Sequence, residues 1–219
     1  MARAKPGNIL LVGGGGHSRV VLSTLRALGN FQIVGLVDKN LKPEVLVNGV
    51  KVLGSDEVLQ EVYRQGCDLA FISVGSVGNS GVRRKLFEKL TTIGFSLPSL
   101  VDPKAVVDDS VQLGAGTYVA AGAVVQSGAV IGKNVIINTG AVVDHDCSLG
   151  DFVHLAPGAT LSGGVHVGEG SHIGTGSSVI EGISVGNQTM IGAGSVVIKD
   201  IPDDCKAFGN PCRIQEKTK

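Results

Sequence analysis

Aliphatic side chains recur at every sixth position through the second half of the chain, and no break in register interrupts the series. Its members are Val101, Val107, Leu113, Val119, Val125, Ile131, Ile137, Val143, Leu149, Leu155, Leu161, Val167, Ile173, Val179, Val185, Ile191 and Val197. Glycine often follows the aliphatic residue, and the fifth position of each hexad is small or β-branched. A six-residue period drifts around an α-helix of about 3.6 residues per turn and leaves no continuous apolar face there. The pattern is instead typical of a parallel β-helix.

Three hexads are expected to form one triangular coil, so residues eighteen apart in the sequence stack in columns. Neighbouring coils then lie about 4.8 Å apart, which is the spacing of strands in a sheet. Counting in eighteens predicts that Gly163 stacks on His145 and that His172 stacks on His154.

The N-terminal part of the chain alternates between strand and helix patterns. Asn8 to Val12 is a predicted buried strand that runs into glycines, and apolar residues then recur at helical spacing up to Gly29. Further strands are predicted over 32–37 and 68–74, and further helices over 55–65, capped by Ser55, and from Val82 to Gly94. We therefore predict a Rossmann-like α/β domain over residues 1–97, followed by an all-β parallel β-helix domain over residues 98–219.

Four glycines, residues 13–16, separate the first strand from the first helix. Backbone N–H groups without side chains can approach an anion there, and the helix N-terminus adds its dipole, which favours a phosphate site. Ser18 stands where the dinucleotide fingerprint has its third glycine, so a turn needed only for packing is the alternative. His17 is either a donor to a bound diphosphate or an exposed loop residue. Asp38 either accepts from a ribose or base or caps its turn.

Composition and charge narrow the class of protein. The chain has 33 glycines and no tryptophan, which suits tight corners around a narrow core. Its net charge of zero supplies no field that would attract nucleic acid or an anionic membrane. The first apolar run is too short to cross a membrane, and the four cysteines form no CxxC pair. We expect no nucleic-acid, membrane or metal partner, and a cytoplasmic location.

His145 differs from the small and aliphatic residues around it because Asp144 and Asp146 flank it. An imidazole with a pKa near neutrality accepts a proton at cellular pH, and a neighbouring carboxylate orients the ring and stabilises the imidazolium ion. His145 is therefore a candidate general base and Asp146 its partner. A solvated histidine at a coil corner is the alternative.

The hexads occur together with the motifs Gly-Gly-Gly-Gly-His-Ser at 13–18, Asn-Thr-Gly at 138–140, Asp-His-Asp-Cys at 144–147, His-Leu-Ala-Pro-Gly at 154–158 and Gly-Asn-Pro-Cys-Arg at 209–213. In this order they resemble the hexapeptide-repeat acyltransferases, in particular bacterial nucleotide-amino-sugar N-acetyltransferases and their sialic acid O-acetyltransferase relatives. The resemblance covers essentially the whole chain. It implies a left-handed β-helix, a homotrimer, acetyl-CoA in the groove between adjacent β-helices, and a nucleotide sugar on the N-terminal domain.

The function implied by the resemblance is transfer of acetyl from acetyl-CoA to the amine of a nucleotide-linked 4-amino-4,6-dideoxy sugar. O-acetylation of sialic acid or of another sugar hydroxyl is the alternative. Family members often carry Glu where this chain has Asp146, so the shorter side chain is expected to reach the ring differently. The same resemblance assigns the backbone N–H of Gly163 to the oxyanion and His154 to the thioester end of acetyl-CoA, while Thr175 and Ala193 line the CoA groove.

The resemblance places the nucleotide-sugar pocket at Gly15, Gly16, His17, Asp38, Lys39 and Gly75. Asn138 is either a sugar ligand near the reacting amine or a stacked polar residue at a corner. His166 and His172 match no family motif and are predicted to be surface corner residues.

Two further functions remain open from sequence. Left-handed β-helices also hold zinc in carbonic-anhydrase-like trimers, but such sites need three imidazoles, two of them closely spaced, and the histidines of this chain lack that pairing. A structural or nucleotide-sensing module is the other possibility. The sequence also leaves the nucleotide, UDP, GDP or dTDP, undecided.

Overall fold

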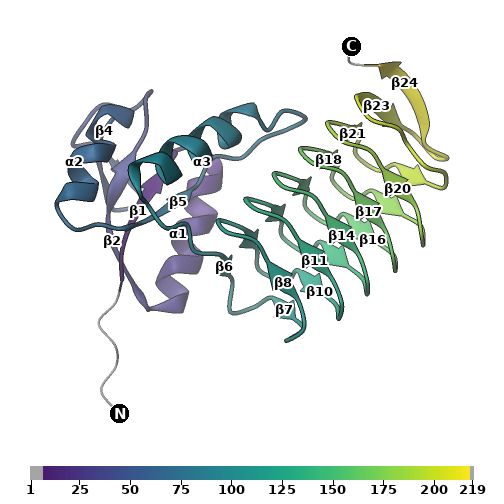
Figure 1. Ribbon diagram of the computed structural model, residues 1–219, viewed down its shortest axis with the longest axis horizontal. Helices are drawn as coiled ribbons and strands as arrows, with labels where there is room; N and C mark the ends of the chain where they lie inside the picture. Colours follow the sequence, from purple (N-terminus) through teal and green to yellow (C-terminus); the bar gives the residue numbers. More distant parts are fainter. Residues whose placement is uncertain (1–6, 218–219) are drawn as a thin grey trace. The chain divides into compact units, whose positions relative to one another are not determined.

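The computed structural model describes residues 7–217, and the chain divides into two compact units (Figure 1). The first unit extends to Gly75 and resumes over Val82–Pro103. The second contains Ser76–Gly81 and the chain from Lys104 onward. The predicted domains, 1–97 and 98–219, differ from these units at the loop 76–81 and over 98–103.

The first unit is an α/β fold built on a five-stranded sheet of order β3-β4-β2-β1-β5. Its elements are β1 (Gly7–Val12), α1 (Gly16–Leu28), β2 (Phe31–Val37), β3 (Leu46–Val47), β4 (Val50–Gly54), a 3-10 turn η1 (Asp56–Val58), α2 (Leu59–Arg64), β5 (Leu69–Ile72), α3 (Gly81–Ile93) and β6 (Leu100–Val101). All pairings in this sheet are parallel except β3 with β4. The predicted strands and helices are therefore present, although Ser55 holds its N-cap position without a side-chain hydrogen bond.

The hairpin of β3 and β4 is the element that the sequence analysis missed. Asn48 and Gly49, which join its strands, both have positive φ, 47° and 78°. An Asn-Gly pair between short apolar runs is a strong hairpin signal, because both residues tolerate this left-handed conformation. The hairpin leaves Leu46 exposed.

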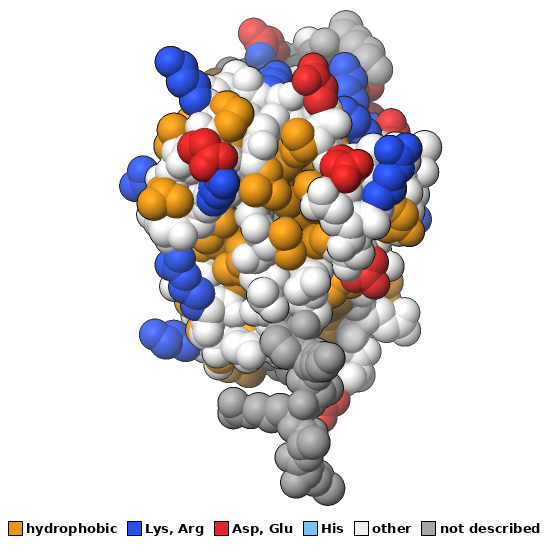
Figure 2. Space-filling model, turned by 90° about the vertical axis from the view of Figure 1, so that its left-hand side faces the viewer, with side chains coloured by type: hydrophobic (Ala, Val, Ile, Leu, Met, Phe, Trp, Pro, Cys, Tyr) orange, Lys and Arg blue, Asp and Glu red, His pale blue; other side chains and the backbone are white. Residues whose placement is uncertain are grey.

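Figure 2 shows a face of the molecule on which hydrophobic side chains gather centrally, with charged side chains of both signs around them.

The second unit is a parallel β-helix of three faces. The first face contains β7 (Val106–Val107), β10 (Val124–Val125), β13 (Val142–Val143), β16 (Thr160–Leu161), β19 (Ser178–Val179) and β22 (Val196–Val197). The second contains β8 (Gln112–Leu113), β11 (Val130–Ile131), β14 (Ser148–Leu149), β17 (His166–Val167) and β20 (Ser184–Val185). The third contains β9 (Tyr118–Val119), β12 (Ile136–Ile137), β15 (His154–Leu155), β18 (His172–Ile173), β21 (Met190–Ile191) and β23 (Cys205–Phe208), with β24 (Arg213–Lys217) antiparallel at its end.

The six-residue pattern determines this unit. Each aliphatic hexad residue is the second residue of a two-residue strand, and those from Val119 to Val197 are buried. Residues eighteen apart pair across neighbouring coils, as Val125 does with Val143, so the predicted columns are confirmed. The fourth residue of the hexads turns the corners with positive φ, and it is usually glycine. Within residues 7–217, every helix is too short or too polar to span a lipid bilayer.

Candidate active site

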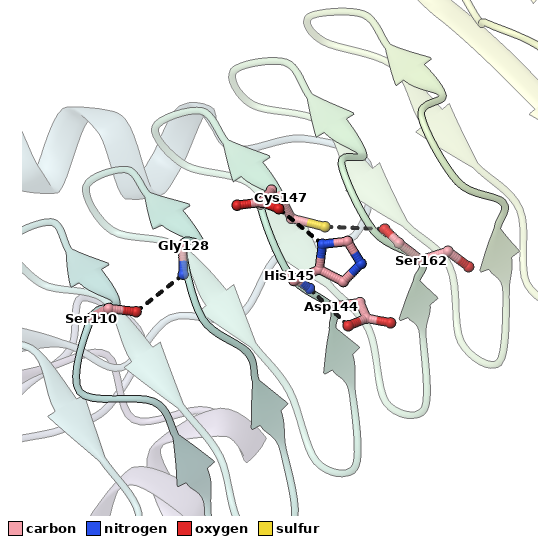
Figure 3. Close-up of polar contacts among 7 residues, drawn as sticks. Ser110, Gly128, Asp144, His145, Cys147 and Ser162 are labelled. Carbon is pink, nitrogen blue, oxygen red and sulfur yellow. Dashed lines mark hydrogen bonds and ion pairs between the residues drawn. The ribbon is translucent and has the colours of Figure 1, made fainter.

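His145 lies at the corner that follows β13, and Figure 3 shows its side chain there. Its Nδ1 is 2.9 Å from Asp146 Oδ2, and its backbone N–H donates to Asp144 Oδ1 at 2.8 Å. The side chain remains 57% exposed, so it is open to a substrate. Because Nδ1 is engaged by the carboxylate, Nε2 is the nitrogen that is available to accept a proton.

Asp146 reaches the ring because of its backbone conformation. It occupies the positive-φ corner position, at φ 58°, where most coils have glycine. Aspartate, like asparagine, tolerates this left-handed region better than most other side chains do. The shorter carboxylate, in place of the Glu common in the family, thus makes the contact directly.

Gly163 lies directly against the imidazole, as the column predicts. A Cβ atom added there would stand 2.5 Å from His145 Nε2, so only glycine leaves room for the ring. Its backbone N–H has no acceptor among residues 7–217, whereas the equivalent groups of Lys133 and Glu169 donate to the side chains of Asp151 and Asn187. The corner therefore presents a base nitrogen and a free N–H donor side by side.

The charges near His145 favour its protonated form. The hydrogen bond to Asp146 raises the pKa of His145 above its usual range, and the charges of Asp144, Asp146 and Glu181 act in the same direction. A base with a raised pKa is a stronger proton acceptor, and its imidazolium ion is stabilised once formed.

Glu181 was missed by the sequence analysis. It lies eighteen residues after Gly163, and therefore belongs to the same column as His145. The eighteen-residue spacing that links His145 to Gly163, continued by one more coil, would have identified it.

A second candidate site is a pocket of about 680 Å³ in the first unit, at the carboxyl ends of β1, β2 and β5. Ligands of open α/β sheets bind at such ends. The pocket is lined by all six residues that were predicted for the nucleotide-sugar pocket, namely Gly15, Gly16, His17, Asp38, Lys39 and Gly75. It adds polar side chains that the sequence analysis did not select, Asn40, Asp56, Ser73 and Lys85.

Asp38 holds the glycine turn in place. Its Oδ2 accepts from the N–H of Gly14 at 2.7 Å, and its Oδ1 accepts from the N–H of Asn40 at 2.7 Å. Both carboxylate oxygens therefore serve the pocket's own backbone, as the turn-cap alternative predicts.

His17 lies near the start of α1 and is half-buried. Burial, reinforced by the positive charge of the buried Arg83, lowers the pKa of His17 to about 4. The ring is therefore neutral at cellular pH, and toward a diphosphate it can act as an N–H donor without adding charge. No Cβ at Gly15 or Gly16 would meet a heavy atom within 4 Å, so the backbone beside it is open to a ligand.

His154 and Asn138 form a hydrogen-bonded chain in the second unit. His154 Nδ1 is 2.5 Å from the carbonyl oxygen of Ser76, and its Nε2 is 3.2 Å from Asn138 Nδ2. These contacts correspond to a neutral ring that donates from Nδ1 and accepts at Nε2. Asn138 Oδ1 in turn accepts from the N–H of Thr139 at 2.8 Å. The structure thus places both residues beside the loop 76–81.

His172 is not the surface corner residue that was predicted. It pairs in register with His154 in the third face, with ring centroids 4.9 Å apart, and it is only 6% exposed. The prediction was wrong because His172 starts a strand, where the outward side chain is covered, and does not lie at a corner. His166 is exposed as predicted, but like His172 it starts a strand and does not lie at a corner, and its Nδ1 is 2.7 Å from Ser148 Oγ.

Thr175 and Ala193 lie at a different corner from His145. They follow β18 and β21 of the third face, stack in one column, and are exposed. Neither backbone N–H has an acceptor within residues 7–217. In the same range, no group of three His, Cys, Asp or Glu side chains is placed to hold a metal ion.

Relatives identify the two units. Residues 8–90 match the PglD N-terminal domain, and residues 128–163 match the bacterial transferase hexapeptide (six repeats). A crystal structure of a histidine-to-asparagine mutant of perosamine N-acetyltransferase from Caulobacter crescentus, in complex with CoA and GDP-perosamine, is 43% identical, with a TM-score of 0.91. That similarity covers 96% of this chain and 97% of the other. The chain belongs to the hexapeptide-repeat nucleotide-amino-sugar N-acetyltransferases.

Two further relatives agree. The acetyltransferase domain of PglB from Neisseria gonorrhoeae is 39% identical with a TM-score of 0.89, over 95% of this chain and 99% of that one. UDP-N-acetylbacillosamine N-acetyltransferase of Bacillus subtilis is 41% identical over 116 residues, which are 52% of this chain and about half, 51%, of that protein. The predicted fold class, a Rossmann-like domain followed by a left-handed β-helix, and the predicted class of acetyl-CoA-dependent sugar N-acetyltransferase are thereby confirmed.

Proposed function

We propose that this acetyltransferase acts on a nucleotide-linked 4-amino-4,6-dideoxy sugar and uses His145 as its general base. The observation that carries the proposal is the placement of the imidazole, with Nδ1 held by Asp146 and Nε2 over Gly163. A perosamine N-acetyltransferase, whose substrate is a sugar of this class, shares the whole fold. O-acetylation of sialic acid or of another hydroxyl is the competing activity.

The reaction follows from these positions. The sugar amine attacks the thioester carbonyl carbon of acetyl-CoA, and His145 Nε2 takes the proton that the nitrogen loses. The free N–H of Gly163 stabilises the negative charge that develops on the carbonyl oxygen. The carbon–sulfur bond then breaks, and the imidazolium returns its proton to the leaving sulfur, giving the amide and CoA thiol. Asp146 keeps the ring oriented and stabilises it while it is charged.

The CoA groove is supported by exposed backbone donors. The N–H groups of Thr175 and Ala193 lie one coil apart and lack acceptors among the described residues, so they suit amide carbonyls of an extended pantetheine arm. His154 has both ring nitrogens engaged by Ser76 and Asn138. Its proposed contact with the thioester end therefore requires exchange of one of these bonds.

The separation of the two corners supports a homotrimer. His145 and Gly163 follow strands of the first face, whereas Thr175 and Ala193 follow strands of the third face. One triangular coil directs these corners apart, so a shared active site needs the His145 corner of one copy and the Thr175 corner of another. A trimer with closed symmetry forms three such sites. Light scattering on the purified protein should give three times the chain mass.

The pocket of the first unit is proposed to hold the nucleotide diphosphate. The open glycine turn and the N-terminus of α1 supply N–H donors, and His17 supplies another. Lys39 and Asn40 beside Asp38 are available to a base or ribose. The four cysteines are free and buried, which supports the predicted cytoplasmic location.

The test of the function is a competition assay. Purified enzyme with acetyl-CoA is offered amino sugars linked to UDP, GDP and dTDP, beside free sialic acid, and thiol release and product mass are followed. The proposal expects an N-acetylated nucleotide sugar. Acetylated sialic acid as the main product would establish the competing activity.

Replacing Asp146 by asparagine should change the pH profile. The base acts in its neutral form, so activity falls as the pH drops through the pKa of His145, which is raised in the wild type. Asp146→Asn removes the main cause of that shift, so the acid limb of kcat against pH should move to lower pH. The plateau should also fall, because the imidazolium loses its carboxylate. A lower plateau with an unmoved acid limb would contradict the assigned pairing.

Removing the Asp38 carboxylate should weaken nucleotide-sugar binding. Asp38→Ala leaves the N–H groups of Gly14 and Asn40 without their acceptor, and a hydrogen bond to a charged group contributes about 1.5–3 kcal/mol. KM for the nucleotide sugar should rise by about tenfold or more, while kcat at saturation changes little. Asp68→Ala, an exposed carboxylate of the same unit, is the control. Equal KM values for the two variants would contradict a role of Asp38 in binding the nucleotide sugar.

A further inference from the structure

Glu181 continues the column that starts at His145 and Gly163. The three residues are spaced by eighteen, and the coils are held in register by backbone bonds. The N–H of Gly164 donates to the carbonyl of His145 at 2.9 Å, and the N–H of Gly182 donates to the carbonyl of Gly163 at 3.0 Å. The carboxylate of Glu181 therefore projects from the same corner as the proposed base.

The surface between the two side chains is open. A Cβ atom at Gly164 or Gly182 would meet no heavy atom within 4 Å, and Gly163 itself has no side chain. Two coil spacings place the Cα atoms of His145 and Glu181 roughly 10 Å apart. The imidazole leans across this gap, because its Nε2 is the ring atom nearest to the Cβ position of Gly163.

The Glu181 carboxylate is not neutralised by a partner. It makes no ion pair within residues 7–217, and Lys199, one coil further along the sequence, does not pair with it there. Asp144 and Asp146 are the other charged groups that face the ring, and Asp146 is already bonded to Nδ1. Glu181 is thus the carboxylate across the open surface at Gly163 from the proposed base, His145.

We propose that Glu181 determines specificity for an amine by binding the sugar amino group as its ammonium ion within reach of His145. The proposal rests on the function proposed above. The amino group of such a sugar has a pKa near that of an α-amino group, about 8, so the substrate binds largely in its protonated form at neutral pH. A carboxylate attracts that cation, whereas a sugar hydroxyl in the same place carries no charge.

The proton balance is complete without another reactant. The ammonium loses one proton to solvent when it becomes the nucleophilic amine, and Glu181 then accepts a hydrogen bond from the neutral nitrogen. The second proton passes to His145 Nε2 during attack on the thioester and leaves with the CoA thiol. Ammonium and thioester thus give amide, thiol and one released proton.

The test uses the full-length enzyme, GDP-perosamine and its 4-hydroxy analogue as probes. Glu181→Gln should raise the KM for GDP-perosamine by about fivefold at neutral pH, the effect of one part-exposed ion pair, with kcat within about twofold. The difference in KM between Glu181→Gln and the wild type should shrink at pH values above the pKa of the sugar amine, where the amine is uncharged. Binding of the 4-hydroxy analogue, measured by calorimetry, should not change. Glu181→Asp should restore part of the affinity.

Glu169→Gln is the matched control, because Glu169 has the same hexad position at another corner. An unchanged KM in Glu181→Gln, or an equal loss for the 4-hydroxy analogue, overturns the inference about Glu181. So does a loss that appears only in the KM for acetyl-CoA. Failure of the proposed function is a different result, because wild-type enzyme would then acetylate none of the amino-sugar nucleotides in the panel.

Discussion

His145→Ala is expected to lower kcat by on the order of a thousandfold, the contribution of a positioned general base. The side chain is mostly exposed at a corner and supports no core packing, so thermal unfolding and the elution volume of the assembly should stay as in the wild type. KM for both substrates should change little, because the pocket of the first unit and the Thr175 corner, the proposed binding sites, are untouched. Initial rates of thiol release at saturating substrates measure the effect.

The control for this variant is His166→Ala. His166 is also an exposed imidazole of the β-helix, but it belongs to the second face and bonds only Ser148 in the described structure. Its removal should leave kcat unchanged. If His145→Ala kept more than a tenth of the wild-type rate, another group would have to be the base, and the proposed mechanism would fail.

Gly163→Ala is expected to lower kcat by about a hundredfold, the typical result of moving a catalytic group by about 1 Å. A methyl group at this position would stand 2.5 Å from Nε2 and 2.6 Å from Cε1 of His145, far inside contact distance. The imidazole must therefore move, and the ring is free to do so because it is exposed. The backbone of Gly163 does not have positive φ, so alanine introduces no strain there and the fold should be retained.

A double-mutant cycle separates this displacement from general damage. Adding Gly163→Ala to His145→Ala should cause little further loss, because the N–H of residue 163 remains and no ring is left to displace. Fully additive losses would mean that alanine perturbs the corner itself and not the histidine. A pH profile of Gly163→Ala whose acid limb lies at the same pH as in the wild type would also be inconsistent with a displaced base.

Much of the β-helix could be predicted because its determinants are local and repeated. A buried aliphatic residue every six positions and a corner residue that tolerates positive φ are both visible in the sequence, so the register of every coil followed. The same count placed Gly163 against His145. The α/β unit was predicted less completely, since the Asn48–Gly49 hairpin was overlooked although its signal was present.

The candidate site was predicted only in part. Counting identifies a column but not which side chains in it are covered, and this is why His172 was misplaced. Its burial depends on which residues cover the outer surface of the third face, and the sequence around His172 does not indicate this. Likewise, Asp38 was recognised as a pocket residue, but its two bonds to the N–H groups of Gly14 and Asn40 depend on how β1 and β2 pair.

The sequence by itself determined the coil period, the columns and the class of enzyme, because hexad packing and family motifs are properties of consecutive residues. Only the tertiary structure decided what the side chains at the site do. Asp146 reaches Nδ1 because the corner turns with positive φ, and the Gly163 N–H is free because no side chain of a neighbouring coil accepts it. Both depend on atoms in adjacent coils or on a corner geometry, and the order of residues along one strand does not specify them.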